Sequence, residues 1–324
     1  MQDETIKSIP SDRLQFFPIM MFATIMGLAG LTLVYERMNE IFFFPSIIAT
    51  LMLSGTTIAY FLVVVFYILK IMKHKEEVKK ELKHPVRINF FAASSIATLL
   101  MSIIYRHYIV ELSQIFFIIG AVLHIFFTFY TVKFWINNNL EMQHSNPAWF
   151  IPIVGNLIVP IAGIGFIDNS ILYFYYSIGI FFWIVLFAII LNRIIFHNQF
   201  APKFMPTLFI LIAPPAIGFV SYIKLTGSLD FFAQILFNLG IFFTVLVFIM
   251  YKNFVNIKFF ISWWAFTFPM AAVTLSAILM YDLTHFWVYS VLAYILTTIT
   301  TIVVLLVAKE TFVHMRKKEI CIME

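Results

Sequence analysis

The chain has 324 residues, of which 62% are hydrophobic and only 11% are charged. Soluble domains average about 25% charged residues and under about 50% apolar ones, so this composition excludes a water-soluble globular fold. The lone cysteine, Cys321, excludes an intrachain disulfide.

The chain starts with a polar stretch, residues 1–16, that carries Lys7 and Arg13. It has no short apolar core of the kind that a cleavable signal peptide needs. We therefore expect a cytoplasmic N-terminal segment over 1–16, a transmembrane domain over 17–308 and a cytoplasmic tail over 309–324.

Long apolar runs follow one another along the transmembrane part. A helix that crosses the hydrocarbon core needs about 20 apolar residues. The runs are continuous instead of alternating with polar residues, which favours helices over a β-barrel. We predict an all-α polytopic membrane protein of about ten transmembrane helices. They are expected near 17–35, 46–70, 88–105, 111–134, 149–167, 171–192, 206–223, 230–251, 260–281 and 285–308.

The basic residues predict the orientation. With the N-terminus in the cytoplasm, 18 of the 21 Lys and Arg lie inside, and only Arg37, Arg106 and Lys224 lie outside. This is a strong positive-inside signal. It predicts a multi-pass protein of the cell membrane with both termini cytoplasmic. The net charge of +5 then reflects topology and gives no indication of nucleic-acid binding.

No proline falls inside an even-numbered span, whereas four odd-numbered spans contain proline and Pro85 lies just before the third span. Because proline frees backbone carbonyls, which lipid cannot satisfy, odd helices should lie inside the protein and even helices against lipid. Spacing agrees: Pro85, Pro147 and Pro206 stand 62 and 59 residues apart. We predict five helical-hairpin repeats around a central pore, although any ten-helix protein spaces its helices similarly.

The predicted spans lack ionisable residues at mid-depth, apart from His124. All 16 acidic residues lie outside the spans or at their ends. This disfavours a cation channel with an acidic ring and a proton pump built on buried carboxylates. We expect His124 to share a hydrogen bond with a neighbouring helix. Arg87, at the mouth of a presumed inner helix, is a candidate for attracting anions into an inner vestibule.

Polar and small residues on odd helices have two possible roles. Asn89 and Asn156 favour hydrogen bonds between helices over contact with a permeating ion. Glycines such as Gly27 and Gly155 allow close helix packing, and some should also leave free space along a pore. The sequence contains no HExxH, GxSxG or glycine-rich phosphate loop, so we expect neither an enzyme nor a metal or cofactor site.

Four stretches resemble the tellurite-resistance and C4-dicarboxylate transporter family, which includes bacterial TehA proteins and the plant slow-type anion channels. They are HPVRINFF at 84–91, NPAWFIPIVGN at 146–156, LFILIAPPAIG at 208–218 and WWAFTFPMAA at 263–272, and FPIMMFATIMGLAGL at 17–31 fits as well. The resemblance covers nearly the whole chain. It implies inner odd helices that form a pore in each subunit of a homotrimer.

The resemblance also implies that a phenylalanine of the ninth helix plugs the pore. It places that residue at Phe268, with Phe266 as the competitor, and places Ala23 opposite, where bacterial members often have glycine. The remaining candidates for lining the pore are Phe22, Gly27, Asn89, Gly155, Asn156, Pro214 and Pro215. Plant channels continue the NFF stretch with Pro-Trp, whereas this chain has Ala92 and Ala93.

Two functions remain open at this point. The leading hypothesis is a channel for small inorganic or organic anions, such as chloride or nitrate, gated by a phenylalanine. The alternative is a transporter of C4-dicarboxylates, sulfite or tellurite-related oxyanions.

Overall fold

The computed structural model describes residues 12–322. Lys7 and most of the expected N-terminal segment lie outside the described residues. Within 12–322 the elements are helices, and only an isolated bridge between Ile164 and Ile167 has strand-like pairing. The predicted all-α fold class is confirmed.

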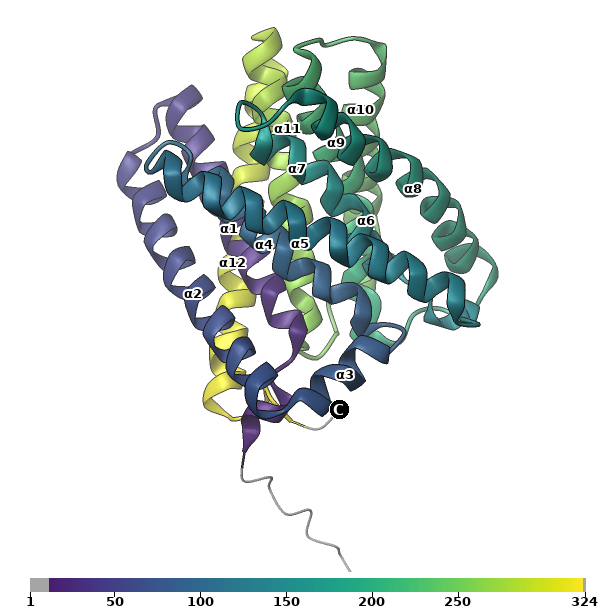
Figure 1. Cartoon of the computed structure of the whole chain (residues 1–324). Coiled ribbons are helices and arrows are strands. Elements are labelled where there is room, and N and C mark those ends of the chain that lie inside the picture. Colours follow the sequence, from purple (N-terminus) through teal and green to yellow (C-terminus); the bar gives the residue numbers. More distant parts are fainter. Residues whose placement is uncertain (1–11, 323–324) are drawn as a thin grey trace, which may run out of the picture.

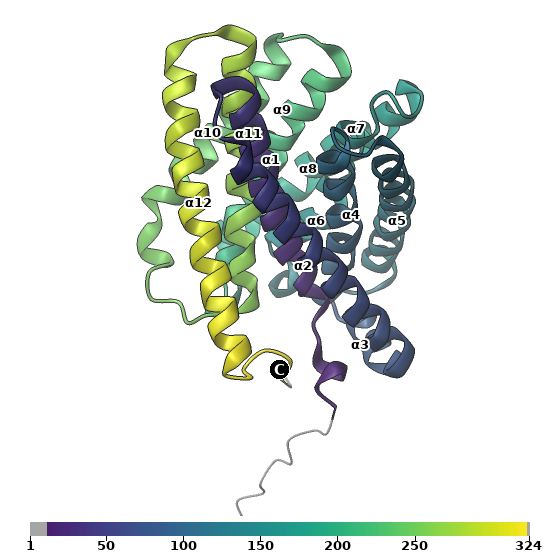
Figure 2. The same ribbon diagram turned by 90° about the vertical axis from the view of Figure 1, so that its left-hand side faces the viewer.

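Burial and packing divide the long helices of Figures 1 and 2 into an outer and an inner set. The outer set consists of α2 (Ser46–Lys73), α5 (Val110–Asn137), α8 (Asn169–Phe196), α10 (Phe231–Ile249) and α12 (Trp287–Arg316). The inner set consists of α1 (Phe22–Phe42), α4 (Phe91–Tyr105), α6 with α7 (Ile151–Val154 and Ile158–Gly163), α9 (Ala213–Thr226) and α11 (Thr267–Thr284). The inner helices close a ring, because α1 packs on α4, α4 on α7, α7 on α9, α9 on α11 and α11 on α1.

Burial separates the two sets as the prolines predict. In the inner helices that are long enough to cross a membrane, 72–89% of the apolar window is buried, compared with 22–39% in the outer helices. The outer helices therefore present apolar side chains outward, as contact with lipid requires.

The fifth span differs from the expected continuous helix. Within 12–322, nine helical stretches are long and apolar enough to cross a membrane, and Pro147–Gly163 is a shorter apolar stretch. It alternates between 3-10 turns (Pro147–Phe150, Gly155–Leu157) and α6 and α7. Pro152 and Pro160 each lack a backbone N–H, and this explains why α-helical hydrogen bonding does not run through.

Each inner helix begins with a 3-10 segment. The segments are Ile19–Met21, Arg87–Phe90, Pro147–Phe150, Pro202–Leu211 and Ile261–Phe266. Apolar periodicity does not predict them, because these stretches are largely buried and show no polar face to set a period.

Both described ends of the chain lie at the same end of the molecule (Figure 1). The Arg13 guanidinium donates a hydrogen bond to the carbonyl of Lys318. We call this the near end and the opposite one the far end. A short helix, α3 (Lys75–Lys83), lies at the near end. Since the chain returns to its starting side, all five inner helices run from the near end to the far end.

Buried charged groups hold the elements of the near end together. Lys70 Nζ lies 2.9 Å from Glu81 Oε2, and both side chains are buried. The Tyr67 hydroxyl donates to the same oxygen at 2.9 Å, and Lys70 Nζ donates to the Phe17 carbonyl at 2.8 Å. These contacts join α2, α3 and the segment that leads into α1.

Candidate functional site

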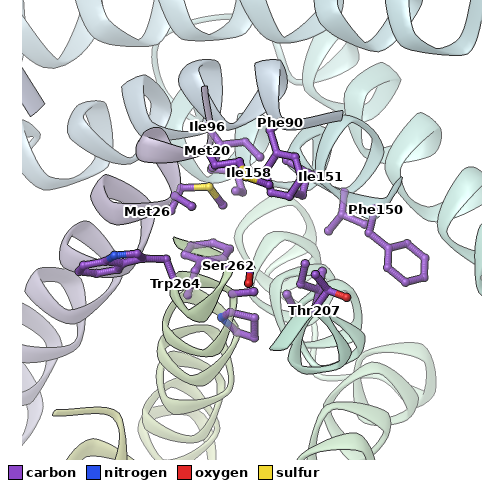
Figure 3. Close-up of a pocket in the computed structure, with 18 of the residues that line it drawn as sticks. Met20, Met26, Phe90, Ile96, Phe150, Ile151, Ile158, Thr207, Ser262 and Trp264 are labelled. Carbon is purple, nitrogen blue, oxygen red and sulfur yellow. The ribbon is translucent and has the colours of Figure 1, made fainter. Parts of the chain in front are cut away.

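A narrow middle cavity of about 60 Å³ lies inside the ring of inner helices. Its lining is almost entirely apolar and includes Ala23, Met26, Ile96, Val154, Ile210 and Phe268. Figure 3 shows Met26, Ile96, Ile151 and Ile158 pointing toward a common space, whereas the ring of Trp264 extends away from it. A cavity of this size has room for only a few water molecules.

The polar side chains of the middle cavity already have partners. The Thr207 hydroxyl donates to the Phe204 carbonyl at 2.6 Å, and the Ser262 hydroxyl donates to the Lys203 carbonyl at 2.6 Å. Trp264 donates through Nε1 to Thr311 Oγ1 at 2.9 Å. All three side chains already donate their hydrogen bonds within the protein. None of them is therefore free to donate to an ion that loses its water in this cavity.

The middle cavity continues into a larger near vestibule. This space of about 860 Å³ shares Met20 and Ile261 with the middle cavity. Basic side chains line it: Lys70, Lys80, Arg87, Lys203 and Lys258. Lys70 and Lys80 are paired with Glu81 and Glu77.

A far vestibule of about 440 Å³ lies beyond the middle cavity. Ile158 and Phe268 line both spaces, so they stand at the boundary. Arg37, Arg106 and Lys224 line the far vestibule as well. These are the three basic residues that we expect, from the sequence, on the outer side of the membrane.

Phe268 is 8% exposed and belongs to the first turn of α11. On the adjacent inner helix α1, a Cβ atom at Gly30 would lie 3.5 Å from Phe268 Cδ2. Ala23 lines the middle cavity with Phe268. The glycine that faces the aromatic ring is thus two helical turns beyond the position that the resemblance selects.

Phe266 lies in a different environment. Its ring centroid lies 4.7 Å from that of Phe209 and 5.8 Å from that of Phe254, both in edge-to-face geometry. It packs in an aromatic cluster, whereas Phe268 borders the cavities.

The remaining residues that we predicted to line the pore lie in different environments. Gly155 lines the middle cavity, as does Ala23. A Cβ atom at Gly27 would lie 2.1 Å from Thr267 Oγ1, so Gly27 allows α1 to pack closely on α11. The Phe22 ring packs on Tyr67 at 5.8 Å. Pro214 and Pro215 are buried in the first turn of α9.

The two asparagines make hydrogen bonds inside the protein. Asn156 Nδ2 donates to Thr128 Oγ1 on α5 at 3.0 Å and to the Ile153 carbonyl at 2.9 Å. Asn89 Nδ2 donates to the Val86 carbonyl at 3.1 Å, close to the start of α4. Asn156 therefore links two helices, and Asn89 stabilises its own 3-10 segment.

His124 is fully buried behind the cavity wall. Its Nδ1 lies 2.8 Å from Ser95 Oγ on α4, so the predicted hydrogen bond to a neighbouring helix is present. A Cβ atom at Gly155 would lie 2.2 Å from His124 Cε1. The absence of a side chain at Gly155 thus lets the imidazole reach the inner ring.

The near end is electropositive. Burial lowers the pKa of His84, and the charges of Arg87, Lys203 and His144 lower it further. His84 Nδ1 accepts hydrogen bonds from the backbone N–H of Val86 at 3.1 Å and Arg87 at 3.2 Å. The N-terminal ends of all five inner helices, which carry partial positive charge, lie at this end too.

A family model for SLAC1, voltage-dependent anion channel, matches residues 16–312. The chain belongs to this family. Relatives include an uncharacterized transporter of Methanocaldococcus jannaschii, 27% identical over 82% of this chain and 85% of its own length. The S-type anion channel SLAH3 of Arabidopsis thaliana is 26% identical over 76% of this chain and 40% of its own length. The tellurite resistance protein TehA homolog of Haemophilus influenzae is 23% identical over 80% of each chain.

Membership confirms the resemblance seen in the sequence motifs. Sequence reasoning missed Ile158, which borders the middle cavity and the far vestibule together with Phe268. It also missed Gly30 as the neighbour of the Phe268 ring. The GLAG segment at 27–30 carried a signal for Gly30, since small residues on an inner helix mark close approaches. Ile158 is one apolar residue among many and carried none.

Proposed function

We propose that the chain is an anion channel in which small anions, such as chloride or nitrate, pass through the ring of inner helices within each subunit. The supporting observation is the series of three cavities, with basic residues at both ends and an apolar constriction between them. Among the described residues, the lining of the middle cavity includes no carboxylate. Neither sign of ion finds a compensating charge at the narrowest part, so the basic residues of the two vestibules carry the preference for anions.

Phe268 is the proposed gate. Its ring and Ile158 lie where the middle cavity meets the far vestibule. An anion cannot shed its water cheaply in a narrow apolar bore, so the constriction blocks conduction both sterically and by dewetting. Rotation of the Phe268 side chain toward Gly30 or away from it would change the width of the bore.

The helix dipoles and basic residues attract anions to the near end. Arg87, Lys203 and Lys258 line the near vestibule, and the inner helices point their N-termini toward it. We assign the near end to the cytoplasm, because 18 of the 21 basic residues then lie on the inside. The protein is accordingly a multi-pass protein of the cell membrane with cytoplasmic termini, without an enzymatic role.

A transporter of C4-dicarboxylates, sulfite or tellurite-related oxyanions is the second candidate. It is favoured by the relative whose name includes tellurite resistance. A carrier coupled to protons needs a titratable group along its path. The middle cavity has none among its lining residues, which favours the channel.

Reconstitution tests the choice. Purified protein in planar bilayers should pass current carried by chloride and nitrate, with a reversal potential that follows the anion gradient. Flux into liposomes should persist when an imposed pH difference is collapsed. Flux that disappears with the pH difference, without measurable bilayer current, would instead establish the carrier. Malate in the same substitution series measures whether dicarboxylates pass.

A further inference from the structure

The far vestibule has the composition of a binding site in addition to its place along the ion path. Its volume of about 440 Å³ is within the range of small-molecule pockets. A bare inorganic anion is close in size to a water molecule, which occupies about 30 Å³ in the liquid. The volume therefore accommodates a larger molecule than chloride or nitrate.

The floor of this vestibule is apolar. It is formed by Phe268 and Ile158 at the constriction and by side chains such as Leu100, Ile161, Ile217 and Leu275. These groups offer neither hydrogen bonds nor charge. An inorganic oxyanion would leave this surface unused, whereas a hydrocarbon body would be transferred from water onto it.

The rim of the vestibule is cationic. Arg37 lies in the penultimate turn of α1, Arg106 directly follows α4, and Lys224 lies in the last turn of α9. Against these three cations the lining contains one carboxylate, Asp282. Arg37 is paired with Glu40 at 2.5 Å, and Glu40 is not among the lining residues.

Arg106 and Lys224 have no carboxylate partner within 4.0 Å in the described range 12–322. Arg106 is nevertheless held in place. Its guanidinium donates to the carbonyls of Ala162 and Ile164 and lies 4.6 Å from the ring centroid of Phe166. Arg106 is thus a positioned cation without a counter-charge, and Lys224 is a second, half-buried one.

We propose that the far vestibule binds a small organic carboxylate, with its carboxylate at the cationic rim and its hydrocarbon body on the apolar floor against Phe268. A molecule bound there would occlude the path from the far side. This blocking role rests on the proposed channel function, whereas binding itself does not.

Binding is tested on the purified protein in detergent by calorimetric titration. The probes are acetate, butyrate and hexanoate, with hexan-1-ol as the uncharged analogue and sulfate as the inorganic anion. Burial of each methylene should raise affinity roughly fourfold. Hexan-1-ol and sulfate should bind far more weakly than hexanoate, because each lacks one of the two interactions. Equal affinities for acetate and hexanoate would overturn the proposal.

Variants locate the site. Lys224→Met keeps the alkyl stem, removes the charge and should weaken hexanoate binding by roughly tenfold or more. Lys224→Arg should restore it. Lys252→Met, on the exposed 3-10 turn Tyr251–Asn253 and outside the lining of all three cavities, is the matched control and should leave affinity unchanged. If Lys224→Met lowers the melting temperature but leaves hexanoate affinity unchanged, the lysine only stabilises the C-terminal end of α9. The proposal is then wrong.

Bilayer recordings test the proposed binding site and the proposed channel function independently. Hexanoate added at the far side should block current in the parent protein and not in Lys224→Met. Lys224-dependent binding in a protein that passes no current would uphold the site and reject the channel. Anion current with no hexanoate binding would reject the site alone.

Discussion

Single side chains decide how close the inner helices and their neighbours approach, and Gly155 is the sharpest case. A methyl group there would lie 2.2 Å from His124 Cε1 and 2.8 Å from Ile96 Cδ1, and the imidazole is held by Ser95. We expect Gly155→Ala to destabilise the protein by about 1–3 kcal/mol through overpacking. Gly55→Ala on α2, with nothing within 4 Å, is the matched control and should be neutral or slightly stabilising. Thermal unfolding in one detergent compares them, and equal melting temperatures would contradict the packing described for His124.

His84 makes the near end sensitive to pH. Its folded-state pKa lies below the usual 6.5, because burial and nearby cations disfavour the charged form. The unfolded chain therefore binds more protons, so this contribution to stability is complete above pH 6.5 and is lost as pH falls through the folded pKa. Protonation of Nδ1 would also remove the acceptor for Val86 and Arg87. His84→Gln should flatten the pH dependence of the melting temperature between pH 5 and 7, about the range in which histidine titrates. An unchanged slope would show that other groups dominate it.

At the scale of elements, the anchoring of α3 depends on a buried ion pair. Removing one partner of such a pair leaves the other charge uncompensated, which typically costs about 3–5 kcal/mol. Glu81→Gln should therefore destabilise the near end and free the segment before α1 from Lys70. Glu76→Gln, in the exposed pair with Lys79, should have little effect. Limited proteolysis of the 74–87 region measures this, and equal cleavage rates in the two variants would contradict it.

Which helices lie inside could be predicted from the sequence, because proline is tolerated only where protein or a cavity satisfies the freed carbonyls. The prolines could not show that the fifth inner helix alternates between α and 3-10 turns. They also could not show that α1 continues to Phe42, beyond the expected end at 35, and carries Arg37. Apolar periodicity carries no information about helix type when every face is buried. The gate candidate was accessible only through the motif around Phe268, since composition does not distinguish it from the other 39 of the 40 phenylalanines.

For the whole molecule, the apolar outer set of helices raises the question of assembly. Many large side chains of the outer helices are at least half exposed, for example Phe61, Phe126, Phe181 and Phe242. We propose a homotrimer with one pore in each subunit, as the resemblance implies. Native mass spectrometry in mild detergent should show three subunits. A monomer in every detergent that preserves the fold would contradict this.

The comparison of Phe268→Ala with Phe266→Ala, recorded as anion current in planar bilayers, tests the proposed gate most directly. Phe266 ends the 3-10 segment before α11 and packs on Phe209, whereas Phe268 lines both the middle cavity and the far vestibule. Phe268→Ala should join the middle cavity to the far vestibule and raise the current strongly, whereas Phe266→Ala should change it little. Both variants are checked for intact folding. If folded Phe268→Ala protein conducts no more than the parent, the aromatic ring at the constriction is not the gate.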